Sequence, residues 1–261
     1  MRKHAFTASL LLVTGGLLAR ADSTISDVFA QSQAGCNYSL TPPYSTCDVI
    51  GAESRFDIQK AQISLTPNAT QASLFLNYGG GPSLSPFYDV LNLSAGDLFF
   101  YNPSNPDQYL YGVPLHSHDS FTAGDVYQIS GNVTTLTAQD VLQDSSHVYR
   151  RDETVWLGSS GPVTPAQTGG TVTTTSYGDG VHNALYNATV QFTNPAGFYQ
   201  ALVSNGSVGV AFASATCGND VIKGTVAVNP EPGSVILLMT CCVFLFAAKF
   251  RRQVLARLGL H

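Results

Sequence analysis

Charged residues make up only 11% of this chain of 261 residues, and basic residues are the scarcer kind, with 12 Lys and Arg against 17 Asp and Glu. The imbalance is stronger between Asp22 and Glu231, where five basic residues stand against all 17 acidic ones and the net charge is −12. A polyanion is repelled by such a surface. The composition therefore argues against a nucleic-acid partner and is compatible with cations or neutral glycans.

Three common motifs of catalysis and ligand binding are missing. Gly158-Ser159-Ser160-Gly161 has the wrong spacing for the Gly-x-Ser-x-Gly turn that presents a nucleophilic serine. The chain has no phosphate-binding glycine loop followed by lysine and no acidic loop with EF-hand spacing. Asp152 and Glu153 are adjacent, so on a strand they point to opposite faces and do not flank one glycosidic bond. The sequence thus favours a protein that is not an enzyme.

The N-terminus has the three parts of a secretory signal peptide. Arg2 and Lys3 are followed by an apolar run from Leu10 to Leu18. Ala19-Arg20-Ala21 then has the small-x-small pattern that signal peptidase reads. We predict that residues 1–21 are a signal peptide, that signal peptidase cleaves after Ala21, and that the mature protein lies outside the cytoplasm.

The C-terminus combines a proline pair, an apolar run and a basic end. Pro230 and Pro232 interrupt regular structure, because proline lacks an amide donor. The run from Val235 to Ala248 is uncharged, and as a helix it measures roughly 21 Å, which flanking residues extend towards the bilayer core of about 30 Å. Basic residues after a span stay cytoplasmic. We predict one C-terminal transmembrane helix that anchors the protein in the membrane before processing.

This order of parts resembles the PEP-CTERM sorting signal of bacterial envelope proteins. The resemblance implies that an exosortase, a membrane-embedded cysteine transpeptidase, recognises Pro230, Glu231 and Pro232, and that Arg251 and Arg252 are the cytoplasmic stop. It implies an inner-membrane intermediate and then release to the cell surface or extracellular matrix. The signal covers about an eighth of the chain, residues 229–261, and departs from the pattern because nine residues follow Arg252 and Phe250 interrupts the basic cluster. The alternative is an ordinary single-span anchor.

Five cysteines are unevenly placed along the chain. Cys241 and Cys242 lie inside the apolar run. Cys36 and Cys47 lie close together in a segment predicted to be outside the cytoplasm, where disulfides form. We predict a Cys36–Cys47 disulfide, and the alternative is a bond from Cys217 to one of them.

The residues between the two ends predict a β-protein. Short alternating segments are separated by Gly, Pro, Asn or Asp, as in antiparallel sheets. The alternation shifts by one residue between 56–60 and 61–65, which indicates a bulge. Further strands are expected at 74–78, 97–101, 108–113, 126–130, 154–157, 171–177, 188–192, 198–203, 208–213 and 221–228. Thr137-Ala138-Gln139-Asp140 has the spacing of a capping box and predicts one short helix.

We expect a single antiparallel β-sandwich, jelly-roll-like, over residues 55–228, after an irregular lead-in over residues 22–54. A barrel with the same strands is the alternative. Three segments resemble ectodomains that occur with this type of tail: residues 117–127, 152–157 and 215–222. That resemblance implies an exported, β-rich body and no particular reaction.

His116-Ser117-His118-Asp119 is the strongest candidate for a metal site. On a strand, His116 and His118 project to the same face, with Asp119 nearby. Zinc sites take a third or fourth protein ligand, and His147, Asp179 and His182 are distant in sequence. The alternative is that His118 and Asp119 make local turn hydrogen bonds.

Calcium is the other cofactor considered, on acidic residues expected in loops or at strand ends: Asp97, Asp107, Asp125, Asp179 and Asp220. Turn hydrogen bonds explain such residues without an ion, so no cofactor is expected.

Eight tyrosines offer flat, amphipathic side chains for stacking on sugars: Tyr88, Tyr101, Tyr109, Tyr111, Tyr149, Tyr177, Tyr186 and Tyr199. The alternative is that they are half-buried cross-strand partners. The whole sequence predicts an exported bacterial cell-surface or matrix protein with a structural or glycan-interaction role, such as contact with exopolysaccharide. The alternative function is a metal-dependent secreted hydrolase that uses His116 and His118.

Overall fold

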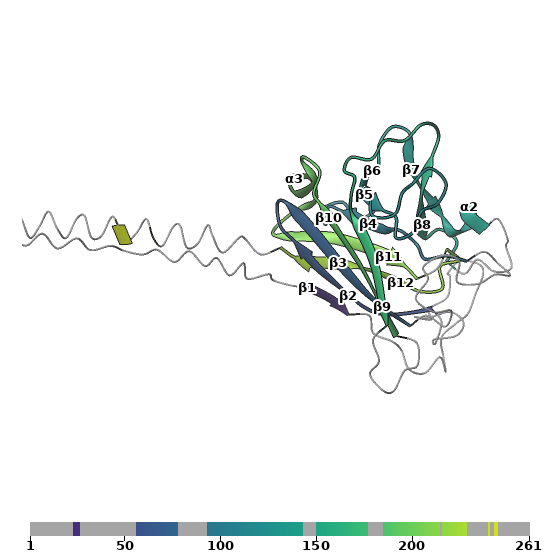
Figure 1. Ribbon diagram of the computed structural model, residues 1–261, viewed down its shortest axis with the longest axis horizontal. Coiled ribbons are helices and arrows are strands. Elements are labelled where there is room, and N and C mark those ends of the chain that lie inside the picture. Colours follow the sequence, from purple (N-terminus) through teal and green to yellow (C-terminus); the bar gives the residue numbers. More distant parts are fainter. Residues whose placement is uncertain are drawn as a thin grey trace, which may run out of the picture. The chain divides into compact units, whose positions relative to one another are not determined.

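The computed structural model describes residues 23–26, 56–77, 93–142, 150–176, 185–214, 216–228, 240 and 243–244. The chain divides into two units, one of residues 21–229 and one of residues 1–20 with 230–261. The larger unit is mainly β-structure with antiparallel sheets (Figure 1). All of the fold below belongs to this unit.

Sheet 1 has five antiparallel strands in the order β1-β2-β3-β10-β9. Their bounds are Ser23–Ser26 (β1), Asp57–Leu65 (β2), Ala69–Asn77 (β3), Leu185–Thr193 (β10) and Thr171–Ser176 (β9). The predicted bulge in β2 is confirmed, because the register of β2 against β3 shifts between Ile58 and Lys60.

Sheet 2 also has five antiparallel strands, in the order β12-β11-β4-β5-β6. Their bounds are Val221–Ala227 (β12), Ser207–Ala213 (β11), Leu98–Tyr101 (β4), Tyr109–Val113 (β5) and Tyr127–Gln128 (β6). A separate two-stranded ribbon pairs β7 (Val133–Thr137) with β8 (Thr154–Ser159).

Sheets 1 and 2 share one hydrophobic core. Alternate residues of β3 and β10, among them Leu74 and Val190, lie in the same buried cluster as Phe100 and Val210 of sheet 2. The ring of Phe100 meets the rings of Phe192 and Phe198 edge-on, with centroids 6.0 and 5.5 Å apart. Each such side chain stabilises the fold by about 1.5–3 kcal/mol through burial.

The other face of sheet 2 is buried as well. Phe99, Tyr101 and Ala211 form a second cluster there with Leu157 of the β7–β8 ribbon. Because both faces of β4 are covered, all four of its residues are buried and its sequence is continuously apolar. Two glycines make room for this packing, Gly112 for Leu157 of the ribbon and Gly209 for the ring of its cross-strand partner Tyr101. A Cβ on Gly112 would lie 2.7 Å from the Leu157 side chain, and one on Gly209 would lie 2.1 Å from the Tyr101 ring.

Helices α2 and α3 both lie in the described part of residues 93–228, for which the sequence predicted one short helix. Helix α2 (Ala138–Leu142) follows the predicted capping box, which is confirmed: the Asp140 amide donates to Thr137 Oγ1 (3.3 Å) and the Thr137 amide donates to Asp140 Oδ2 (2.9 Å). These hydrogen bonds from Thr137 lower the pKa of Asp140.

Helix α3 (Phe198–Leu202) lies where a strand was predicted at 198–203, and that prediction is wrong. Phe198 and Leu202 are both buried, and their spacing of four residues puts them on one side of a helix. Gly197, with φ of 79°, turns the chain into that helix. Two further strands were missed: β7, and β1 inside the expected lead-in.

Among the residues that the structure describes, no helix is long and apolar enough to cross a membrane. Of the predicted span at 235–248, only residues 240, 243 and 244 are described. The signal peptide, Cys36, Cys47 and the sorting residues Pro230, Glu231, Pro232, Arg251 and Arg252 lie outside the described residues.

The contact between Gly209 and Tyr101 gives a direct test of the packing on sheet 2. We expect Gly209→Ala to lower the free energy of unfolding by about 1–3 kcal/mol, because the new methyl group overlaps the Tyr101 ring. Denaturant unfolding measures the change. In a Tyr101→Ala background the same substitution should have a much smaller effect; an equal loss in both backgrounds would show that the ring is not the obstacle.

Candidate functional site

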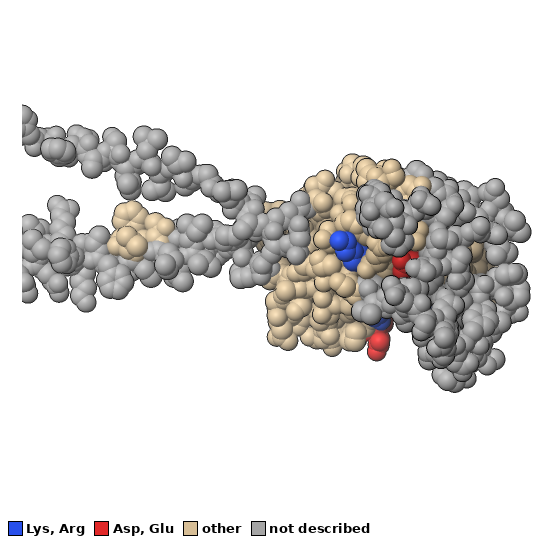
Figure 2. All heavy atoms as spheres, turned by 90° about the horizontal axis from the view of Figure 1, so that it is seen from below, with Lys and Arg blue, Asp and Glu red and all other residues tan. Residues whose placement is uncertain are grey.

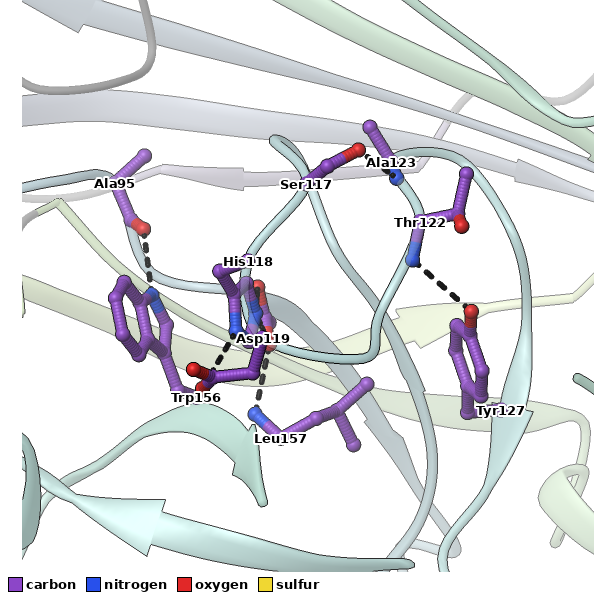
Figure 3. Close-up of polar contacts among 10 residues, drawn as sticks. Ala95, Ser117, His118, Asp119, Thr122, Ala123, Tyr127, Trp156 and Leu157 are labelled. Atoms are coloured by element: carbon purple, nitrogen blue, oxygen red, sulfur yellow. Dashed lines mark hydrogen bonds and ion pairs between the residues drawn. The ribbon is translucent and has the colours of Figure 1, made fainter. Parts of the chain in front are cut away.

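Asp97, at the start of β4, is the most deeply buried acidic residue of the predicted candidates, together with Asp220. Its amide donates to the Val155 carbonyl (2.8 Å), and the preceding Gly96 amide donates to the Ala213 carbonyl (3.0 Å). The carboxylate accepts hydrogen bonds from the Leu157 amide (2.7 Å) and from His118 Nε2 (3.0 Å), as Figure 3 shows around Leu157 and His118. Asp97 thus joins sheet 2, strand β8 and the loop that carries His118.

His118 lies in a tight turn whose backbone bonds to itself. The His118 amide donates to the Phe121 carbonyl (3.1 Å), and the Phe121 amide donates to the His118 carbonyl (2.8 Å). The imidazole stacks on Trp156, with centroids 4.2 Å apart and planes 11° apart. Trp156 Nε1 in turn donates to the Ala95 carbonyl (3.1 Å) (Figure 3). The His118 side chain is only 5% exposed.

Asp119 faces the second nitrogen of the same imidazole. Its Oδ2 lies 3.6 Å from His118 Nδ1, and its side chain is 64% exposed. Asp119 also has a φ of 45°, the left-handed conformation that Asp tolerates better than most residues. The imidazole therefore lies between one buried and one exposed carboxylate.

The charges of this cluster shift the pKa values of both buried partners. Burial alone lowers the pKa of His118, but the hydrogen bonds and charges of Asp97 and Asp119 outweigh it and raise the pKa above the usual 6.5. Burial raises the pKa of Asp97, and its hydrogen bond with His118 opposes this in part. His118 is held in its charged form to higher pH than a free histidine.

His116 lies beside this pair in a different electrostatic state. Its ring centroid is 5.5 Å from that of His118 and 5.7 Å from that of Trp156. Its Nδ1 is buried with no hydrogen-bond partner among the described residues. Burial, with the neighbouring charge of His118, lowers the pKa of His116 to about 4. His116 is therefore neutral at physiological pH.

The predicted metal residues His116, His118 and Asp119 are close together, but their arrangement does not suit a metal. His118 Nε2 donates to Asp97, so that nitrogen is not available as a ligand. In the described part of the chain, no three or more His, Cys, Asp or Glu side chains are arranged to hold a metal ion. His147, Asp179 and His182 lie outside the described residues. The backbone of His118 makes the local turn hydrogen bonds of the alternative, whereas its imidazole bonds to Asp97, 21 residues away.

Carboxylates that were predicted to bind calcium accept hydrogen bonds from backbone amides instead. Asp220 Oδ2 accepts from the Ile58 amide (2.6 Å) and its Oδ1 from the Val221 amide (2.8 Å). Asp125 Oδ1 accepts from the Gly169 amide (3.0 Å). Asp107 is exposed at a turn, and Asp97 belongs to the cluster above. These carboxylates link separate segments of the chain through hydrogen bonds. Among the described residues they do not form a group that could hold a cation.

The tyrosines predicted to stack on sugars are mostly packed inside. Tyr101 and Tyr111 are 3% and 4% exposed and pair across strands with Tyr109 and Phe100, so the reading as cross-strand partners fits them. Tyr109, Tyr186 and Tyr199 are half-buried against the two clusters. Tyr101 and Tyr109 meet edge-on at 5.9 Å, and Lys223 Nζ lies 5.4 and 5.2 Å from their ring centroids. Tyr88, Tyr149 and Tyr177 lie outside the described residues.

Cys217 is a buried thiol without a disulfide in the described structure. Burial raises its pKa to about 12, so it is unreactive as a thiolate. Beside it, Arg150 Nη1 donates to the Gly218 and Asn219 carbonyls (2.9 and 2.5 Å). This role of Arg150 was not predictable from the sequence, because the carbonyls that it contacts are 68 and 69 residues away along the chain.

Comparison of the chain with protein-family models, with curated proteins and with solved structures finds no match. Any statement of function therefore depends on the residues of this chain alone.

The buried Asp97 carboxylate gives the first test of the cluster. We expect Asp97→Asn to lower the free energy of unfolding by about 3 kcal/mol, because it removes the charge that pairs with buried His118. The matched control is Asp119→Asn on the exposed side of the same imidazole, where we expect a change of at most about 0.5 kcal/mol. Equal stabilities of the two variants in denaturant unfolding would contradict this assignment.

The neutral state of His116 gives a pH test. Its folded pKa of about 4 lies below the ordinary 6.5, so the unfolded chain takes up a proton in this interval that the folded chain does not. This contribution to stability is complete above pH 6.5 and falls as the pH drops to 4, by about 3 kcal/mol in total. His116→Gln should lack that part of the pH dependence. An NMR titration of the wild-type ring with a midpoint near 6.5 would refute it.

Proposed function

We propose that this chain is an exported bacterial envelope protein that an exosortase sorts and cleaves at its PEP-CTERM-like tail, and that then has a structural or glycan-interaction role at the cell surface or in an exopolysaccharide-rich matrix. The observation that carries this proposal is the order of parts in the tail: Pro230-Glu231-Pro232, an uncharged run from Val235 to Ala248, and then Lys249, Arg251 and Arg252.

Exposure of the tail supports this proposal. Among the described residues, the large hydrophobic side chains that are exposed are Val243 (65%) and Phe244 (61%), both inside the predicted span. Exposed apolar side chains of this kind need a cover, and a bilayer provides it for a segment flanked by basic residues.

The boundaries of the larger unit agree with the proposed processing. That unit covers residues 21–229, so it begins at the proposed signal-peptidase site and ends immediately before Pro230. Cleavage at both sites would leave the shared core of sheets 1 and 2 intact. For this body we propose a β-sandwich, since two sheets enclose one core; the jelly-roll-like form stays a prediction.

The alternative of a metal-dependent secreted enzyme on His116 and His118 has less support. His118, one of the two proposed metal ligands, already donates a hydrogen bond to Asp97. Its imidazole stacks on Trp156, and its side chain is only 5% exposed. A substrate would have no direct access to such an imidazole.

Processing in the native host tests the proposal. Intact-mass analysis should find a chain that begins at Asp22 and ends near the Pro-Glu-Pro element, and protease added to whole cells should reach it. The double variant Pro230→Ala/Pro232→Ala should accumulate as the longer, membrane-bound form.

Pro106→Ala, in an exposed loop, is the matched control and should be processed normally. A wild-type chain that keeps residues 229–261, or that whole-cell protease does not reach, would contradict the proposal.

A further inference from the structure

The outer face of sheet 1 is a continuous array of neutral polar side chains. The strand register places Thr24, Gln62, Ser73, Thr189 and Thr173 in one row across all five strands. Each residue in this row carries a hydroxyl or carboxamide group. Strand neighbours lie about 4.8 Å apart, so the row spans roughly 19 Å.

The two flanking rows also consist mostly of residues with a hydroxyl or carboxamide group. One consists of Ser64, Gln71, Gln191 and Thr171, and the other of Ser26, Lys60, Phe75, Asn187 and Thr175. Lys60 is the one charged residue in the three rows, and its Nζ lies 4.3 Å from the centre of the Phe75 ring. Not one of the 17 acidic residues falls in these rows, although the body is acidic.

Burial distinguishes this face from the opposite one. Thr171, Thr173 and Thr175 on β9 are exposed, whereas Val172 between them packs against the shared core. In the middle of the face Ser64 and Ser73 are buried, whereas Asn187 and Thr189 on β10 are half-buried. Hydrogen bonds link these groups: Ser73 Oγ lies 3.1 Å from Thr189 Oγ1, which donates to Asn187 Oδ1 (3.2 Å). Such links restrict the side chains before any ligand binds, which lowers the entropy lost on binding.

The outer face of sheet 2 differs, because among the described residues the β7–β8 ribbon packs over Phe99, Tyr101 and Ala211 there. Figure 2 views the molecule from below, and the described surface there carries only isolated charged groups. The exposed part of the sheet 1 rows that carries the argument lies on β9 and β10, at Thr171, Thr173, Thr175 and Gln191. Neutral donors and acceptors there match a partner with many hydroxyl groups and no charge.

We propose that the outer face of sheet 1 binds a neutral polysaccharide, with the β9 threonines and the β10 side chains Asn187, Thr189 and Gln191 as hydrogen-bonding groups. This inference rests on the proposed function, because a protein outside the cytoplasm is the kind that meets such polymers. An anionic polymer is disfavoured by the net charge of the body. The binding site is thus this polar face and excludes the buried tyrosines.

Co-sedimentation with insoluble polysaccharides tests the inference. The full-length protein, solubilised in mild detergent, is mixed with microcrystalline cellulose, with insoluble β-1,3-glucan, or with alginate beads as the anionic probe. We expect binding to at least one neutral polymer that changes less than twofold between low and 0.5 M salt (about three times a physiological ionic strength), since exposed charges contribute little. Alginate should not retain the protein.

The double variant Thr173→Val/Thr175→Val removes two hydroxyl groups and keeps the β-branched shape that suits a strand. We expect its affinity to fall at least fivefold, as the loss of about two hydrogen bonds predicts. Thr225→Val is the matched control, because Thr225 is an exposed strand threonine on β12 of sheet 2, and it should stay within twofold of the wild type. If the double variant does not fold, Gln191→Ala on the exposed part of the face replaces it.

Three results would overturn the inference. The first is no retention of the wild type on any neutral polymer, and the second is equal retention of the double variant and Thr225→Val. The third is that the wild type is a dimer in sedimentation velocity and the double variant a monomer, with glycan binding unchanged. The last would assign the face to a second copy of the chain. The assay uses purified protein, so its failure is distinct from a failure of sorting, which the host experiment detects.

Discussion

The fold of the body depends on one buried carboxylate whose hydrogen-bond donors come from two other segments of the chain. Asp97 is fully buried and accepts hydrogen bonds from the Leu157 amide and from His118 Nε2. A buried charge without such partners is strongly unfavourable. Strand β8, the His118 turn and the start of β4 therefore have to meet at this point. Trp156, stacked on His118 and bonded to the Ala95 carbonyl, completes the junction.

This junction determines which surfaces are left for function. It holds the β7–β8 ribbon against the outer face of sheet 2, where Leu157 packs over Gly112 and the aromatic cluster forms. The outer face of sheet 1 keeps exposed threonines on β9. The candidate residues for chemistry, His116 and His118, are thus part of the internal structure, and the neutral face of sheet 1 is the part that is suited to a partner.

Most strands were predictable because sheet residues alternate and turns contain Gly, Pro, Asn or Asp. The bulge of β2 and the capping box of α2 were predictable for the same local reason. The helix at Phe198–Leu202 was not, since the aromatic pair Phe198-Tyr199 favours a strand and the helical state depends on Gly197 and on a core position for Phe198. The Asp97–His118 pair was not predictable either, because its partners are 21 residues apart and Leu157 lies 60 residues from Asp97.

Amide hydrogen exchange at Leu157 tests the account most directly, because this amide donates to the buried Asp97 carboxylate. The account predicts that it exchanges only when the whole body unfolds, at the slowest rate among the residues of the β7–β8 ribbon. Exchange as fast as at the exposed end of the ribbon, such as Ser159, would contradict the central role of the Asp97 junction.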